Sequence, residues 1–394
     1  MDICVDKLKL YCIDNMITKV FGRTFATAGR LMTWGETTYG WGRETNSRLR
    51  VPGAVEGFDD VVEVATGPYH MLLRTSNKEV FSVGLGDNGR LGNGSTNTLE
   101  TPESIEALNG ADITQVSAGW NHSLALSGSG HVYSWGFGGY ANPVLRALFW
   151  NSSSSPLGHE DLGDVTTPRV IDGLNAPIAQ VAAGKEVSFA LAQSGELYGW
   201  GNTLASFGEN SSSTPVPLEE INFFLHKHHA NVLKIASSGS NGFLLLDNGR
   251  LYAIGRNNGG VFGTRNNPKT ITDNFLTSLT KVVDEDYSNE RIVDFKVSGN
   301  SLVFITDSGA VFYSGMHNTF RPERFPLNEQ VRSIFATYDS VGVIGQSGQI
   351  SFINDAFIDD AIKKGKVMIN LDPSLNNAID IGGSHKLRYA LVGN

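Results

Sequence analysis

One pattern recurs along this chain, and this repetition limits the possible folds more than any other feature. Its clearest copy, Ile113–Gly136, reads as a short strand, a glycine turn, a second strand of alternating apolar residues, a second turn, and a third strand ending in Trp-Gly. A hairpin of this size cannot bury its apolar face alone, so the copies must stack on one another. Five further copies occupy Val62–Gly84, Ile178–Gly201, Val232–Gly255, Ile292–Gly315 and Val331–Asn354.

A seventh unit is split between the two ends of the sequence. It begins at Ala378 and stops before a third strand, whereas Gly29–Gly35 has the third-strand pattern with no first or second strand before it. We therefore predict an all-β protein: a seven-bladed β-propeller of four-stranded antiparallel blades with small helical insertions. The ring would be closed by the N-terminal strand, with Leu31–Trp34 pairing with Tyr389–Val392 of the C-terminal blade.

Composition agrees with many short strands and tight turns, because 45 of the 394 residues are glycine. We expect an N-terminal extension over 1–24 and a single propeller domain over 25–394, with insertions near 137–156, 218–231 and 355–368. After the third strand, Thr-Pro pairs such as Thr101-Pro102 are expected to begin outer edge strands, where a missing N–H costs nothing.

The net charge and the cysteine content argue against several classes of protein. A net charge of −9 has the wrong sign for a nucleic-acid binder. Cys4 and Cys12 are the only cysteines, too few for a disulfide framework or a cysteine-based zinc site. No apolar run approaches the length of a membrane-spanning helix, and the acidic start argues against a secretory signal. The segment Lys19–Arg30 is basic and hydroxyl-rich like a mitochondrial transit region, and no basic nuclear-targeting cluster is present. An intracellular location, mitochondrial or cytoplasmic rather than nuclear, is expected.

The repeat resembles that of the regulator of chromosome condensation family, a family of seven-bladed β-propellers. The resemblance covers 25–394 and is strongest around Gly119, His122, Trp135 and Gly136. Anchoring the units on their first-turn glycine gives Gly67, Gly119, Gly184, Gly239, Gly299, Thr337 and Gly383. The family's signature histidine is then kept at His70, His122 and His385, and is replaced by Val187, Gly242, Leu302 and Ser340 in the other units, as in a divergent member.

These repeat residues are expected to be structural, with His70 and His122 buried and hydrogen-bonded between strands. The residues predicted to maintain the repeat are Gly67, His70, Gly84, Gly119, His122, Trp135, Gly136, Gly184, Trp200 and Gly201.

We find no pattern that predicts catalysis, a cofactor or a metal. The segment Gly84–Gly89 formally matches the dinucleotide fingerprint, but no helix can follow it, so turn glycines are the better interpretation. His226, His228 and His229 lie in an expected amphipathic helix over 218–229 that packs Phe223 and Phe224 on the propeller; a third metal ligand is missing. We therefore expect a non-enzyme.

The insertion near 137–156 interrupts a loop with an apolar, helix-like segment. Its residues Leu145, Arg146, Leu148, Phe149 and Trp150 are the candidate partner-binding group. In exchange factors that the repeat resembles, a wedge in the corresponding region contacts a GTPase. The alternative is an insertion folded against its own propeller. A second segment, Phe357–Met368, is expected to form a helix in place of an outer strand.

The acidic balance, the missing catalytic groups and the apolar insertion favour a non-enzymatic interaction propeller, a scaffold or accessory subunit of a large protein complex. A guanine-nucleotide exchange factor acting on a small GTPase is the alternative, because exchange needs no covalent chemistry. Chromatin binding is disfavoured by the net charge, and an ultraviolet sensor by the single Gly-Trp-x-His copy at Gly119–His122.

Overall fold

A computed structural model of the chain describes residues 28–35, 49–139, 155–202, 211–257, 260–263, 275–282, 290–315, 321–338, 340–354, 368–369, 373–383 and 387–393. Within them, the structure is nearly all antiparallel β. The one described α-helix is α4 (Glu219–Lys227), and short 3-10 turns lie at Asp87–Gly89, Glu106–Leu108 and Pro373–Leu375.

The strands form five four-stranded sheets and one eight-stranded sheet. The four-stranded sheets follow the chain in order. They are β7 (Ile113–Ala118), β8 (His122–Ser127), β9 (Val132–Gly136) and β10 (Val165–Val170); β11 (Ile178–Ala183), β12 (Val187–Ala192), β13 (Leu197–Gly201) and β14 (Ser212–Pro217); β15 (Val232–Ser238), β16 (Asn241–Leu246), β17 (Leu251–Arg256) and β18 (Phe275–Lys281); β19 (Ile292–Ser298), β20 (Ser301–Thr306), β21 (Val311–Ser314) and β22 (Glu323–Arg324); and β23 (Val331–Thr337), β24 (Ser340–Gly345), β25 (Ile350–Asn354) and β26 (Met368–Ile369).

The eight-stranded sheet joins the two ends of the described chain. It contains β1 (Gly29–Gly35), β2 (Leu49–Ala54), β3 (Val61–Thr66), β4 (His70–Thr75), β5 (Val80–Gly84), β6 (Leu99–Ser104), β27 (Ala378–Gly383) and β28 (Leu387–Gly393). The predicted pairing of the first strand with the end of the chain is confirmed. It is shifted by one residue, because Leu31 lies opposite Leu391 and Trp34 opposite Arg388.

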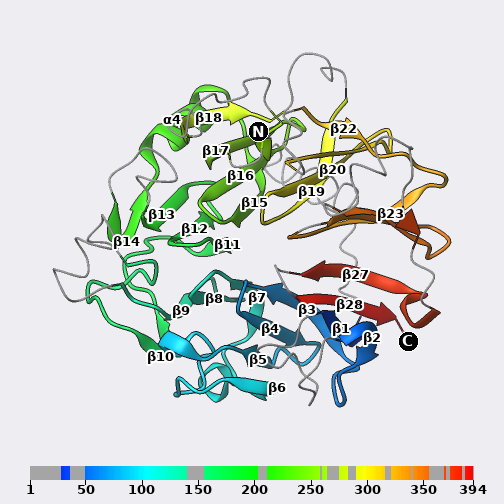
Figure 1. The fold of residues 1–394 in the computed structure, drawn as a ribbon. Coiled ribbons are helices and arrows are strands. Elements are labelled where there is room, and N and C mark those ends of the chain that lie inside the picture. Colours follow the sequence, from blue (N-terminus) through cyan, green and yellow to red (C-terminus); the bar gives the residue numbers. More distant parts are fainter. Residues whose placement is uncertain are drawn as a thin grey trace, which may run out of the picture.

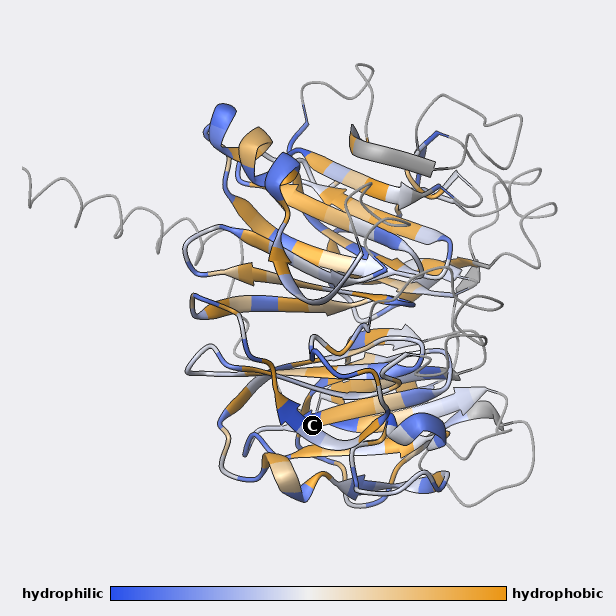
Figure 2. Cartoon of the chain, turned by 90° about the vertical axis from the view of Figure 1, so that its left-hand side faces the viewer, coloured by the Kyte–Doolittle hydropathy of each residue, from blue (hydrophilic) through white to orange (hydrophobic). Residues whose placement is uncertain are grey.

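The sheets stand around a common centre, with β3, β7, β11, β15, β19, β23 and β27 innermost (Figure 1). Figure 2 views them from the side, where hydrophobic residues run along the strands. These residues meet between neighbouring sheets: Leu124 of β8 and Trp200 of β13 share one core cluster, and the rings of Phe243 and Phe295 lie 6.1 Å apart in another. Burial of apolar residues between sheets explains why the units need each other.

Strand pairing separates two faces of the molecule. His122 lies opposite Gly136, so the β7–β8 turn and the β9–β10 connection leave the sheet at the same edge. Leu126 lies opposite Val132 at the other edge, where a tight hairpin joins β8 to β9. The same pairing recurs in the other sheets. We call the edge with the first-to-second and third-to-fourth strand connections the cavity face.

Helix α4 lies on the opposite face, because it follows β14 at the end where Pro217 pairs with Tyr198. The helix was predicted over 218–229, and this prediction is confirmed. Its buried side chains are Ile221 and Leu225, four residues apart on one side of the helix. Phe223 is 69% exposed, so the prediction that it packs on the propeller is wrong, whereas Phe224 contacts Tyr252 at 5.3 Å between ring centroids.

Two further expectations need correction. Met368 was expected in a helix that replaces an outer strand, but it belongs to β26 and pairs with Phe352, because the edge of β25 otherwise lacks hydrogen-bond partners. The prolines of the Thr-Pro pairs lie inside the outer strands rather than at their start. Pro102 sits within β6 at a shift in register, which absorbs its missing N–H.

No helix in the described ranges has the length and apolar character needed to cross a membrane.

Candidate functional site

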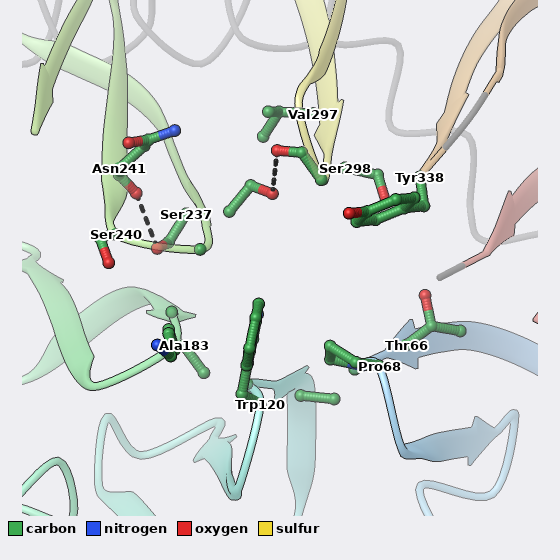
Figure 3. Close-up of a pocket in the computed structure, with 18 of the residues that line it drawn as sticks. Thr66, Pro68, Trp120, Ala183, Ser237, Ser240, Asn241, Val297, Ser298 and Tyr338 are labelled. Carbon is green, nitrogen blue, oxygen red and sulfur yellow. Dashed lines mark hydrogen bonds between the residues drawn. The ribbon is translucent and has the colours of Figure 1, made fainter. Parts of the chain in front are cut away.

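A cavity of about 650 Å³ opens at the centre of the cavity face (Figure 3). Its wall is formed by the ends of the innermost strands and by the turns that follow them. The turn residues at its mouth are Pro68, Tyr69, Trp120, Lys185, Gly239, Ser240, Gly299, Asn300 and Tyr338.

Close backbone contacts between neighbouring turns explain the first-turn glycines. A Cβ on Gly67 would lie 2.1 Å from the carbonyl oxygen of Gly119, and one on Gly119 would lie 2.5 Å from that of Gly184. The turns are also tied by hydrogen bonds, since Trp120 N donates to Gly184 O at 3.2 Å and Lys185 N donates to Gly239 O at 2.7 Å. At Gly67 and Gly119 glycine is required, because a Cβ would push these adjacent turns apart.

Strand register corrects the anchoring of three units. In the split unit, Leu387 pairs with Gly35 as His122 pairs with Gly136, so Leu387 and not His385 occupies the histidine position. Asn241 pairs with Gly255 as His122 pairs with Gly136, so Asn241 occupies the histidine position that the sequence analysis gave to Gly242. By the same comparison, Ser301 replaces Leu302, and Ser238 and Ser298 replace Gly239 and Gly299 at the first-turn position. In these two turns, Gly239 and Gly299 follow the serine by one residue, and the sequence analysis took them for the first-turn glycines.

Serine takes over the role of glycine in these two sheets by making the contact with its own side chain. Ser238 Oγ donates to Gly299 O at 3.0 Å, and Ser298 Oγ donates to Gly383 O at 2.9 Å. The first of these bonds joins neighbouring turns, whereas the second passes the β23–β24 turn and reaches the end of β27.

His70 and His122 are fully buried beneath the turns. His70 Nε2 lies 2.8 Å from Ser123 Oγ and His122 Nε2 lies 2.9 Å from Ser188 Oγ, each in the next sheet. Burial lowers the pKa of His122 to about 3. Burial, followed by the nearby Arg90 and His122, holds the pKa of His70 well below its ordinary value. Both rings are therefore neutral structural links between sheets.

Asn241 shows what happens when the matching partner changes. In the next sheet, Leu302 stands where Ser123 or Ser188 would form the hydrogen bond with the histidine. Asn241 Oδ1 is buried and has no hydrogen-bond partner in the described part of the chain.

The other repeat residues also hold the turns and loops. Trp135 Nε1 donates to Arg90 O at 2.9 Å, and Trp200 Nε1 donates to Pro156 O at 2.8 Å. Gly84, Gly136 and Gly201 have positive φ, and a Cβ on any of them would lie 2.3–2.6 Å from a backbone carbonyl oxygen.

At the mouth of the cavity, residues at one turn position differ strongly from sheet to sheet. Pro68, Trp120, Lys185 and Tyr338 are bulky, while Gly239 and Gly299 have no side chain. Tyr338 lies beside Ser298 and across the cavity from Trp120 and Pro68 (Figure 3). The Lys185 ammonium lies 4.9 Å from the Trp120 ring centroid. Half-exposed aromatic rings beside a cation are groups that partners commonly contact.

Below the mouth, the innermost strands carry a ring of polar side chains. Each has a bulge after its first residue, followed by one of Glu63, Gln115, Gln180, Lys234, Asp294, Ser333 and Asp380. Several reach the next strand: Gln115 Nε2 donates to Val181 O at 3.0 Å and Gln180 Nε2 to Leu233 O at 2.6 Å. The ring was not predicted, although polar residues at one repeat position were a visible signal.

Each charged side chain of this ring is paired with a side chain of opposite charge, from the ring itself or from a residue beside it. Lys234 and Asp294 lie 2.5 Å apart, Lys296 and Asp380 lie 3.6 Å apart, and Glu63 pairs with Arg74. The carboxylate of Asp380 raises the pKa of Lys296. These residues therefore leave no unpaired charge in the channel, by which we mean the space below the cavity that the innermost strands surround.

The candidate partner-binding group Leu145, Arg146, Leu148, Phe149 and Trp150 lies outside the described residues, as does His385. The chain leaves the described structure after Gly139 and returns at Ser155, and both flanks lie on the cavity face. Gly138 N donates to Asp164 Oδ1 at 3.1 Å, and Ser155 N donates to Ser213 Oγ at 3.2 Å.

The described residues contain no cluster of three His, Cys, Asp or Glu side chains that could hold a metal. The His228 ring packs against Phe224 instead in a tilted arrangement, with ring centroids 4.5 Å apart. The segment Gly84–Gly89 ends in a single 3-10 turn, so no helix awaits a pyrophosphate there.

Comparison with known proteins identifies the repeat. Models of the Regulator of chromosome condensation (RCC1) repeat match residues 78–126 and 113–141. The human E3 ubiquitin-protein ligase HERC2 is 34% identical over 191 residues, which cover 46% of this chain and 4% of HERC2. The human probable E3 ubiquitin-protein ligase HERC6 is 30% identical over 327 residues, which cover 80% of this chain and 30% of HERC6. The chain thus spans less than a third of these relatives.

The crystal structure of Prp20p from Saccharomyces cerevisiae has the same fold, with a TM-score of 0.73 and 18% identity over 93% of this chain and 92% of that chain. Together with the matched repeats, this places the chain among the RCC1-like propeller proteins, as a divergent member of the family.

Proposed function

We propose that this chain is a non-enzymatic interaction module, a closed seven-bladed propeller that binds other proteins through its cavity face. Seven blades are supported by the eight-stranded sheet, which divides into two four-stranded blades where β1 and β3 share only the pair Gly29–Val61. Closure is supported by the seven residue pairs between β1 and β28.

One observation favours the cavity face as the binding surface. The opposite face consists largely of tight hairpins, while the cavity face gathers the variable turns, the aromatic rings of Trp120 and Tyr338, and both flanks of the apolar insertion. Variable loops on a constant scaffold are where propellers and other repeat proteins bind. The relatives HERC2 and HERC6 are ubiquitin ligases, and Prp20p binds Gsp1p and histones. A role in a multiprotein assembly agrees with these similarities.

Differential capture tests this proposal. The tagged full chain, a Trp120→Ala variant and a variant lacking residues 144–150 are compared with Phe223→Ala, an exposed aromatic residue on the opposite face. Partners captured by the wild type, measured by quantitative mass spectrometry, should be lost with the cavity-face variants and kept with Phe223→Ala. Loss with Phe223→Ala alone, or capture that no variant changes, would contradict the proposal.

Exchange activity on a small GTPase is the second candidate. It is favoured by the fold shared with Prp20p and by an apolar insertion whose flanks lie on the cavity face. Release of labelled GDP from a panel of small GTPases distinguishes the two: acceleration that requires residues 144–150 supports exchange, and none across the panel supports a pure interaction module.

A further inference from the structure

If the cavity face binds proteins, as proposed above, the chemistry of the cavity selects what they insert. We propose that the cavity accepts a carboxylate-bearing, acidic segment of the partner protein.

Backbone donors at the mouth are unoccupied. The turns between β15 and β16 and between β19 and β20 consist of Gly239-Ser240 and Gly299-Asn300, and their N–H groups make no hydrogen bond in the described structure. Nothing lies within 4 Å of the Cβ position of Gly239, whereas that of Gly299 lies 2.5 Å from the Tyr338 ring, so the turn at Gly239 is the more open of the two. Successive backbone N–H groups in a concave turn favour negatively charged ligands.

Side-chain donors surround the same space. The indole N–H of Trp120 has no acceptor in the described structure, whereas those of Trp135 and Trp200 donate to buried carbonyls. The Ser240 hydroxyl and the Asn300 amide likewise have no hydrogen-bond partner among the described residues, and both line the cavity. The site therefore offers donors from three turns to one occupant.

The charge of the wall has one sign. Lys185 is the only charged residue among the described residues that line the cavity. Its ammonium lies 3.3 Å from Glu186 Oε1, but Glu186 does not line the cavity and also accepts from Asn202 Nδ2 at 3.2 Å. The channel below is neutral, because its lysines are paired with Asp294 and Asp380.

These features exclude the other simple occupants. An apolar side chain would leave the turn N–H groups unpaired, which costs free energy once water is displaced. A basic side chain would face Lys185 with no carboxylate on the described wall. A carboxylate accepts several N–H bonds at once and pairs with the ammonium of Lys185, so it fits the donor set best.

Binding of a defined acidic peptide tests the inference. The probe is a rhodamine-labelled hexaglutamate peptide, followed by fluorescence anisotropy, with hexaglutamine of the same length as the reference. The wild type should bind hexaglutamate at least tenfold more tightly than hexaglutamine, and added salt should weaken this preference. Lys185→Gln should reduce the affinity for hexaglutamate about tenfold, the scale of one charge-assisted hydrogen bond.

Matched variants separate the site from general charge effects. Lys185→Arg keeps the charge and should retain binding, and Trp120→Phe keeps an aromatic ring but loses the N–H, so it should weaken binding several-fold. Lys227→Gln removes the same charge from exposed α4 on the opposite face and should bind like the wild type. Thermal melting of each variant confirms that it is folded.

Equal affinity for the two peptides, or equal loss with Lys185→Gln and Lys227→Gln, would overturn the inference. If either occurs while Trp120→Ala still abolishes partner capture, the cavity face binds proteins but does not select acidic segments. If partner capture is unchanged as well, the proposed function fails with it.

Discussion

The buried histidines should make this protein sensitive to mild acid, and His122 allows the effect to be measured. The His122 ring is inaccessible to solvent, and its pKa is about 3 in the folded protein compared with 6.5 for an ordinary histidine. Between these values the unfolded chain binds a proton that the folded chain does not. Its contribution to stability is therefore complete above pH 6.5 and is lost as the pH falls toward 3.

The size of the loss follows from the unfolded-state value. At pH 5.0, about 1.5 pH units below the ordinary pKa, protonation of the unfolded chain costs about 2 kcal/mol of folding free energy, and at pH 7.5 the cost is near zero. A His122→Gln variant lacks this titration but also loses the bond of His122 to Ser188, which we expect to cost about 1–2 kcal/mol at pH 7.5.

The assay is urea denaturation of the wild type and His122→Gln at pH 7.5 and 5.0. The stability difference between the two proteins should shrink, or reverse, by about 2 kcal/mol at the lower pH. The same substitution at His131, an exposed histidine in a hairpin, serves as the control, because it leaves the buried bond of His122 to Ser188 in place. A difference between wild type and His122→Gln that is the same at both pH values would refute the reasoning.

Three further substitutions test the packing of the ring. Gly119→Ala places a Cβ 2.5 Å from a neighbouring carbonyl oxygen and should lower the unfolding free energy by about 1–3 kcal/mol. In the same urea assay, Gly163→Ala should stay within about 0.5 kcal/mol of the wild type, because nothing lies within 4 Å of the Cβ position of Gly163. Leu31→Ala removes a fully buried side chain where β1 meets β28 and should lower the melting temperature through a loss of about 2–5 kcal/mol; an unchanged melt would mean that this pairing does not stabilise the fold. Tyr389→Phe removes a hydroxyl that donates to Asp380 at 2.8 Å and should cost about 1–2 kcal/mol in chemical denaturation, with no loss if water replaces the bond.

Much of the fold was predictable because tight turns and half-buried strands each require particular residues at fixed positions of the repeat. Turn glycines, alternating apolar strands and a third-strand fragment at Gly29–Gly35 correspond to strands in the structure, including the partner of β28. Register was less predictable. From the sequence, either Ser238 or Gly239 could be the residue that contacts the neighbouring turn. The pairing of Ser238 with Asn241 in the structure shows that it is Ser238.

The candidate site was the least predictable part. The cavity is built from turns of six separate repeat units, and none of its residues forms a motif along the sequence. Trp120 and Lys185 come together only because neighbouring turns lie side by side around the centre. Phe223 shows the opposite error: an apolar residue on a helix was expected to be buried, but Ile221 and Leu225 cover that face of the sheet.

The pairing of β1 with β28 has a consequence for synthesis of the protein. Leu31 leaves the ribosome 360 residues before its partner Leu391, which at about 5–20 residues per second is a delay of roughly 20–70 seconds. During that time one edge of β1 has no strand to receive its hydrogen bonds, and such an edge invites association with other chains. The unpaired edge of β1 therefore persists until β28 has been made.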